Sequence, residues 1–160
     1  STTAVFIAKN IKNKKQLTVI TNSIENLLEL SDISGWEIIS TGGLLNGDSM
    51  SFLGIKAADS IKRYNADKVF LSCKGVDIQK GVTEGSDETG CIKQSMIQSA
   101  KKVYLTVDSS KFDKVAFSNI CPLSGLDVVV TDRKPDDRWM EAFEKNGIQC
   151  IYPEEINEAD

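Results

Sequence analysis

The sequence contains no histidine. This absence excludes Ser-His-Asp and Cys-His catalytic sites, the H-E-x-x-H metal helix and ordinary imidazole acid–base catalysis. The four cysteines (Cys73, Cys91, Cys121 and Cys150) form no C-x-x-C pair, which argues against zinc and thioredoxin-type sites. We therefore expect no metal and no cofactor, and we expect the reduced thiols of a cytoplasmic protein.

Long hydrophobic runs and an excess of basic charge are also missing. No apolar run approaches the roughly 18 residues of a membrane span, and no signal peptide leads the chain. Lys and Arg number 19 against 23 Asp and Glu, which gives a net charge of −4. An acidic domain without a basic stripe binds nucleic acid poorly on its own. We expect neither a membrane nor direct DNA contact for this chain.

What is present is the composition of one globular domain, with 160 residues, 41% of them hydrophobic and 26% charged. Short runs rich in Val and Ile alternate with stretches of helical periodicity. The predicted strands cover 17–21, 36–41, 68–73, 102–108, 127–131 and 148–152. The predicted helices cover 2–12, 23–31, 54–65, 88–100 and 135–146.

This alternation predicts an α/β fold, a doubly wound and mostly parallel sheet with helices on both faces. In such a fold, a helix that begins "STT" should follow directly on a strand, yet the sequence opens with these residues. We expect the chain to be cut from a longer protein, within or just before that strand.

Ligands of open parallel sheets bind beyond the carboxyl ends of the strands. The loops that enter the predicted strands, such as "KNKKQ" and "EKNG", are charged and solvating. The loops that leave them are "TNS" (21–23), "TGG" (41–43), "CKGVD" (73–77) and "DSSKF" (108–112). They concentrate glycines, hydroxyls and a few charges, so the sequence predicts a binding site at the edge that they share.

The first helix supplies the anion-binding part of this prediction. Hydroxyls and first-turn amides at Ser1, Thr2 and Thr3 can donate hydrogen bonds to a phosphate, and the helix dipole favours negative charge there. A plain helix cap explains the same residues and stays open as the alternative.

The other candidates supply charge and hydrogen-bond groups. Lys74 and Lys111 can attract a phosphate, and Asp77 and Asp108 can accept bonds from sugar hydroxyls. The remaining candidates at these loops are Thr21, Asn22, Ser23, Gly42, Gly43, Gly75 and Ser109. Helix capping and turn formation are the structural alternatives for all of them.

The stretch "FLSCKGVDIQKGVTEGSDETGCIKQSMIQSAKKVYLTVDSSKF" resembles the C-terminal effector domain of the DeoR family of bacterial transcriptional repressors of sugar metabolism. The matching features are Gly75 to Asp77, Gly81 to Thr83, the helical Lys93 and the strand end "DSSKF". "STT", "LTVITNS" and "IISTGGLLN" match as well. One departure is Cys91, which stands where many members carry an acidic residue.

The resemblance implies a fold similar to ribose-5-phosphate isomerase and a domain, here 1–160, that senses a phosphorylated sugar or related catabolite. It implies a winged helix-turn-helix that binds operator DNA and is absent from this chain, and a homo-oligomer. By this likeness Ser1, Thr2 and Thr3 hold the phosphate with help from Lys111. The residues implied to line the sugar are Gly42, Gly43, Gly75, Asp77, Thr83 and Asp108.

An enzyme of the sugar-phosphate isomerase type, using the same site, is the alternative function. It requires a carboxylate poised over the substrate, and the sequence offers no convincing base, so we expect a sensor and no enzyme. The stretch 74–90, with glycines at Gly75, Gly81, Gly85 and Gly90, is predicted to be a loop that is mobile until the effector orders it.

Overall fold

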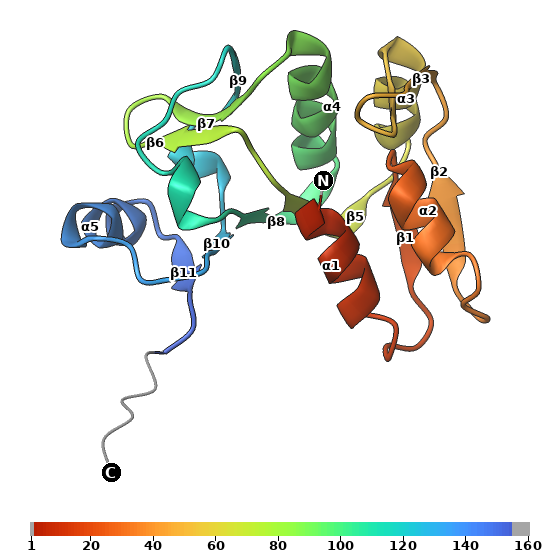
Figure 1. Cartoon of the computed structure of the whole chain (residues 1–160), viewed down its shortest axis with the longest axis horizontal. Helices are drawn as coiled ribbons and strands as arrows, with labels where there is room; N and C mark the ends of the chain where they lie inside the picture. The colour runs from red at the N-terminus through yellow and green to blue at the C-terminus, as the bar shows by residue number, and fades with distance from the viewer. Residues whose placement is uncertain (1, 155–160) are drawn as a thin grey trace.

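The computed structural model describes residues 2–154 and shows an α/β domain (Figure 1). All five predicted helices are present: α1 (Thr2–Asn10), α2 (Ile24–Leu30), α3 (Ile55–Ile61), α4 (Asp87–Gln98) and α5 (Asp137–Lys145). The predicted strands are present as β1 (Thr18–Thr21), β2 (Glu37–Ser40), β5 (Ala66–Leu71), β8 (Ala100–Thr106), β10 (Val128–Val130) and β11 (Gln149–Ile151).

These strands pair in parallel, in two groups. One sheet has the order β11-β10-β8-β5, and β1 pairs with β2 in a second sheet. The expected α/β class with a mostly parallel central sheet is confirmed.

Two antiparallel parts were not predicted. β3 (Leu44–Asn46) and β4 (Ser51–Leu53) form a hairpin. β6 (Gly75–Asp77), β7 (Gly81–Glu84) and β9 (Ser118–Cys121) form a three-stranded sheet. Both follow directly on parallel strands, so they extend the carboxyl edge of the fold.

The prediction that 74–90 is a loop is therefore wrong, while its ordering by an effector stays a prediction. Most of this stretch forms β6, β7 and the start of α4, and two of its glycines serve close packing. A Cβ on Gly75 would lie 2.4 Å from the carbonyl oxygen of Lys114. A Cβ on Gly81, whose φ is +76°, would lie 2.2 Å from the carbonyl oxygen of Cys121.

The main core lies under α4 and α5. Leu105 and Val129 of the sheet are buried against Trp139 and Phe143 of α5. Phe112 meets the Trp139 ring edge to face, with centroids 4.7 Å apart. This packing fixes the segment after β8, which carries several of the predicted site residues.

Helix α5 lies within the predicted range 135–146, and local residues fix both of its ends. The side chain of Asp136 accepts a hydrogen bond from the amide of Trp139 at 3.1 Å, which caps the first turn. Gly147 follows the helix with a φ of +68°, the left-handed conformation that stops a helix. Among the described helices, α1 to α5, none has both the length and the apolar character that a bilayer crossing requires.

Candidate functional site

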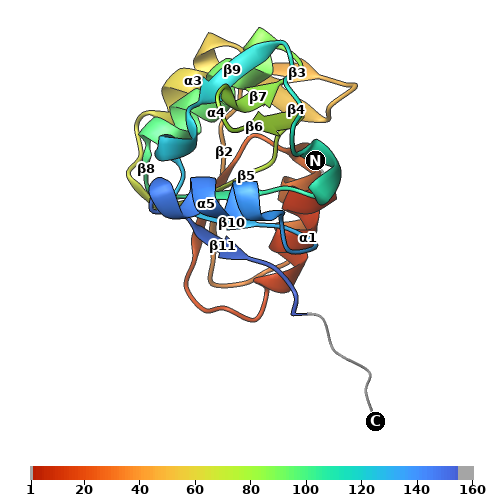
Figure 2. The same cartoon turned by 90° about the vertical axis from the view of Figure 1, so that its left-hand side faces the viewer.

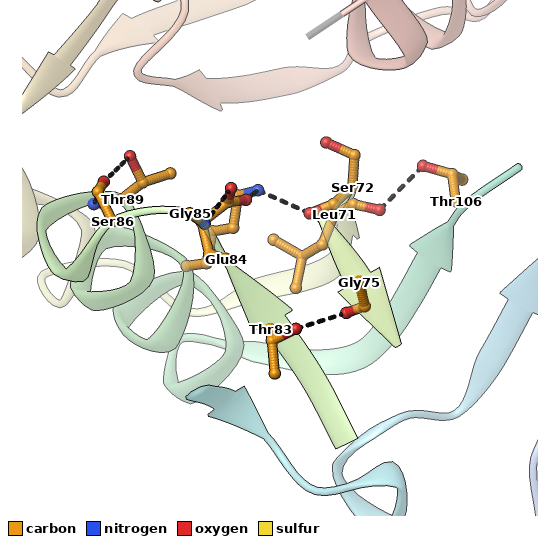
Figure 3. A network of polar contacts seen from close by, with 10 residues as sticks. Leu71, Ser72, Gly75, Thr83, Glu84, Gly85, Ser86, Thr89 and Thr106 are labelled. Atoms are coloured by element: carbon orange, nitrogen blue, oxygen red, sulfur yellow. Dashed lines mark hydrogen bonds and ion pairs between the residues drawn. The ribbon is translucent and has the colours of Figure 1, made fainter. Parts of the chain in front are cut away.

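The most enclosed charged groups of the carboxyl edge lie where β5 ends. Lys93 on α4 donates to the carbonyl oxygen of Ser72 at 2.6 Å and forms a short ion pair with Glu84 of β7. The side chains of Lys93 and Glu84 are only 16% and 7% exposed. The second carboxylate oxygen of Glu84 accepts the amide of Gly85 at 2.8 Å. Figure 3 shows Glu84 next to Gly85, facing the main chain of residues 71–72.

The buried thiol of Cys73 is influenced by the charges of Lys93, Glu84 and Lys111. Burial raises the pKa of the Cys73 thiol to about 12, while the positive charges of Lys93 and Lys111 act in the opposite direction. The bridge between Val76 and Phe112 places the segment that carries Lys111 beside β6, which directly follows Cys73 and the end of β5.

The threonines at this end of the sheet position the backbone. The Thr83 hydroxyl is fully buried, donates to the carbonyl oxygen of Gly75 at 3.0 Å and accepts the amide of Ala116 at 2.8 Å. The Thr106 hydroxyl donates to the carbonyl oxygen of Leu71 at 2.9 Å, across the ends of β8 and β5 (Figure 3). Thr83 therefore has its hydrogen bonds within the protein.

At the end of β1, the predicted residues hold the local structure together. The Thr21 hydroxyl accepts the amide of Ser23 at 3.1 Å, and the Ser23 side chain caps α2 by accepting the amide of Asn26 at 3.3 Å. The Asn22 side chain donates to the carbonyl oxygen of Phe52 at 3.0 Å. Within residues 2–154, the buried Oδ1 of Asn26 has no hydrogen-bond partner, an acceptor that the sequence analysis missed.

The two glycines after β2 differ in their surroundings. A Cβ on Gly42, whose φ is +59°, would meet no atom within 4 Å. A Cβ on Gly43, whose φ is +111°, would lie 2.7 Å from the carbonyl oxygen of Leu53. Gly43 therefore serves packing against β4, whereas Gly42 leaves open space at the edge.

Two carboxylates at the turn after β8 are engaged in hydrogen bonds with the serines of that turn. Asp108 accepts the amide of Ser110 at 3.0 Å and a short bond from the Ser110 hydroxyl, which holds the Asp108 pKa below its usual range. Asp132 accepts the amide of Ser109 at 2.6 Å, and this bond lowers the pKa of Asp132. Both carboxylates are ionised at neutral pH and hold the turn that positions Lys111.

A cavity of about 210 Å³ adjoins this turn. Its lining includes Ser109, Arg133 and Lys134. The sequence analysis missed these two cations because they follow a strand end, "TDRK", that carries no glycine.

The remaining candidates lie in the β6–β7 turn, next to Gly85, or outside the described residues. Asp77 accepts the amides of Gln79 and Lys80, both at 2.9 Å, in the turn between β6 and β7. The side chain of Lys74 is exposed at the start of β6.

The first turn of α1 is described in part. Thr3 is exposed and Thr2 is the first residue of α1, while Ser1 lies outside the described residues. The role of Ser1, Thr2 and Thr3 in phosphate binding stays a prediction. Over residues 2–154, no group of three or more potential Cys, Asp or Glu ligands could hold a metal ion.

The family of this chain follows from its match to a known sensor domain. Residues 1–133 match the family described as the DeoR C terminal sensor domain. The chain belongs to this DeoR sensor-domain family. It is similar to the "Uncharacterized HTH-type transcriptional regulator YulB" of Bacillus subtilis (strain 168), with 37% identity over 93% of this chain and 57% of the relative.

Two further DeoR relatives have named regulatory roles. "HTH-type transcriptional repressor GlcR" of Bacillus subtilis (strain 168) is 33% identical over 97% of this chain and 59% of its own length. "Putative aga operon transcriptional repressor" of Escherichia coli O157:H7 is 27% identical over 94% and 56%. The chain thus spans a little over half the length of these relatives.

Glu84, on the strand β7 that precedes α4, is the carboxylate beside Lys93 in this chain. Cys91 is exposed on α4. The sequence analysis missed Glu84 because it placed this residue in a mobile loop.

The cysteines give a direct check on burial at this site. We expect N-ethylmaleimide at neutral pH to modify the exposed Cys91 first and Cys73 last, because the buried Cys73 thiol, with its pKa near 12, forms almost no thiolate. Peptide mass spectrometry over a time course measures the order. Equal rates at Cys73 and Cys91 would contradict the burial of the β5 end.

Proposed function

We propose that this domain senses a phosphorylated sugar or related catabolite for a transcriptional regulator, most simply a repressor of a sugar-catabolism operon. The observation that carries this proposal is the enclosed Lys93–Glu84 pair at the carboxyl edge, and Lys111 lies on the neighbouring segment that pairs with β6. The edge combines cationic donors with a carboxylate, which are the groups that bind a polyhydroxylated anion.

The chemistry of the pair suits sugar hydroxyls. A lysine ammonium has three donors, and the carbonyl oxygen of Ser72 and the carboxylate of Glu84 account for two of those on Lys93. The third can donate to a ligand hydroxyl, and Glu84 can accept from the next hydroxyl of the same sugar. Buried charged groups of this kind discriminate strongly, because the wrong ligand leaves them unpaired.

The phosphate requires a separate, more exposed location. Lys111 is half-buried beside the end of β5, and the first turn of α1 adds amides that favour an anion. We therefore assign the phosphate to Lys111 and the first turn of α1, and the sugar to Lys93 and Glu84.

The output is a change in operator binding. The HTH in the names of the similar regulators supports a DNA-binding segment elsewhere in the complete protein, and we expect homo-oligomers through which the effector acts. A typical coupling of roughly 1–3 kcal/mol would change operator affinity about 5- to 150-fold. That range is enough to switch transcription.

A thermal-shift screen of the complete protein against sugar phosphates and their unphosphorylated parents tests the proposal. The phosphorylated compound that raises Tm most is then titrated by calorimetry, and the same sample is assayed for product to test the isomerase alternative. Turnover that Asp77→Asn abolishes would replace the sensor proposal by that alternative.

Lys111→Gln and Thr3→Val test where the phosphate binds. We expect each to weaken the phosphorylated effector about tenfold, since a charged hydrogen bond contributes roughly 1.5–3 kcal/mol. The parent sugar should lose less than about twofold. Lys101→Gln, at an exposed lysine of β8, is the matched control. If the affinities for the phosphorylated effector and for the parent sugar fall equally, the phosphate does not bind at Lys111 and the first turn of α1.

A further inference from the structure

Strand β3 is an edge strand without the usual protection, at one end of the domain (Figure 2). On one side it pairs with β4, and within residues 2–154 no strand pairs with its other side. Exposed edge strands are normally guarded by charged residues or proline, because their free main-chain groups recruit further strands. The stretch from Gly42 to Gly47 contains neither, and its leucines Leu44 and Leu45 are 71% and 52% exposed. β3 therefore presents a free, apolar edge to solvent.

The main chain of Leu45 points toward this free edge. On the far side of β4, the amide of Phe52 donates to the carbonyl oxygen of Asn22 at 2.8 Å, so the main chain of Phe52 faces away from β3. Leu45 is the register partner of Phe52. Two residues paired in this way in an antiparallel ladder direct their main-chain groups away from each other. The amide and carbonyl groups of Leu45 therefore face the side of β3 on which no described strand lies.

The charged residues next to β3 lie at opposite ends of the hairpin. Asp48 is in the turn between β3 and β4. Lys56 is in the first turn of α3, just beyond the open end of the hairpin where β4 finishes. Both side chains belong to exposed residues. An antiparallel neighbour of the same sequence would place its own turn beside this open end, and so its acidic residue beside this basic one.

We propose that β3 pairs in antiparallel fashion with β3 of a second copy of this chain, about a twofold axis at Leu45. Leu45 would exchange both main-chain hydrogen bonds with the partner's Leu45, and the hairpins would form one continuous sheet. Asp48 of each copy would meet the partner's Lys56. The occupant is a second copy because this single register satisfies the free edge, covers the exposed leucines and pairs the charges at both ends.

This interface would connect the candidate site to the assembly. β3 begins directly after Gly43, and Gly42 leaves open space at the same edge of the fold. A ligand that occupies this space would contact the chain immediately before the paired strand. The inference rests on the homo-oligomer expected under the proposed function, and it does not depend on which effector binds.

Zero-length cross-linking of the complete protein tests the register. Unlabelled and isotope-labelled protein are allowed to exchange subunits, and a carbodiimide then joins carboxylates to lysines in contact with them. We expect a mixed-isotope peptide pair that links Asp48 to Lys56, which identifies a bond between two copies. An oligomer that gives no such link overturns the interface alone, whereas a complete protein that sediments as a monomer overturns the homo-oligomer as well.

Substitution of Leu45, followed by sedimentation of the complete protein, tests the centre of the interface. Leu45→Lys places like charges at the twofold axis and should raise the dissociation constant between copies at least about 30-fold, as for other central interface residues. Leu28→Lys is the matched control, at a leucine of α2 that is 69% exposed. It should change the dissociation constant less than about twofold. Equal effects of the two substitutions would contradict the interface.

Charge reversal tests the ends of the interface without disturbing its apolar centre. Asp48→Lys and Lys56→Asp should each weaken association at least about tenfold, because like charges then face each other. Both changes together restore opposite charges and should return the dissociation constant to within about threefold of the parent value. Absence of this rescue would overturn the proposal, as would a Leu45→Lys variant that loses effector affinity while its oligomeric state is unchanged.

Discussion

Replacing Lys93 by methionine is expected to lower the free energy of unfolding by about 3–5 kcal/mol. The substitution leaves the carboxylate of Glu84, 7% exposed, without its ion-pair partner. A buried charge without a partner costs far more than the lost attraction of an exposed pair. Chemical denaturation of the variant and the parent, followed by circular dichroism, measures the difference.

The exposed pair of Lys101 and Asp67 is the matched control. Its atoms are 3.1 Å apart, but the side chains are 75% and 84% exposed. Lys101→Met should change stability by no more than about 1 kcal/mol, because solvent screens such pairs. A loss at Lys93 that is as small as the loss at Lys101 would contradict the enclosed site.

The double variant separates the pair from the packing of its side chains. Lys93→Met combined with Glu84→Gln should cost clearly less than the sum of the two single changes, because neither leaves a charge behind once both are made. Strictly additive costs would mean that the two groups do not depend on each other.

Gly81→Ala is expected to be the most destabilising of the glycine-to-alanine substitutions and to lower the free energy of unfolding by about 2–5 kcal/mol. The left-handed backbone disfavours alanine by about 1–2 kcal/mol, and overpacking adds about 1–3 kcal/mol. Its Cβ would lie 2.2 Å from the carbonyl oxygen of Cys121 and 2.7 Å from the Cα of Pro122. Both neighbours are backbone atoms, so β7 and β9 would have to separate.

Gly147→Ala is the control that shares the backbone conformation and lacks the crowding. Gly147 has a φ of +68°, and an added Cβ would meet nothing within 4 Å. Gly147→Ala should lower the free energy of unfolding only by the cost of the left-handed backbone, about 1–2 kcal/mol. If Gly147→Ala proves as damaging as Gly81→Ala in thermal unfolding, the close packing of β7 on β9 is not the cause.

The parallel part of the fold could be predicted because each of its helices and strands has a recognisable local sequence pattern. Runs such as "DVVVT" and the capped helix between Pro135 and Gly147 carry periodicity and boundary residues within a short window. The antiparallel parts could not. β3, β4 and β6 have three residues each, too few for any period to show. Their glycines suggested a loop, whereas Gly75 and Gly81 are required by contacts with residues 114 and 121.

That the loops after the parallel strands gather at one edge could be predicted, because the carboxyl edge follows from chain direction alone. Their role in binding a ligand stays a prediction. Which polar groups are already occupied depends on tertiary contacts. Thr83 bonds to Gly75 and Ala116, and Glu84 meets Lys93, only once β7 is folded.

The location of the phosphate tests the account most directly. The measurement is a crystal structure of the complete protein with the sugar phosphate that raises Tm most. We expect the sugar within hydrogen-bond distance of Lys93 or Glu84, and the phosphate at Lys111 and the first turn of α1. A phosphate in the open hollow of about 510 Å³ between α5 and β11, lined by Met140, Phe143 and Cys150, would contradict the account.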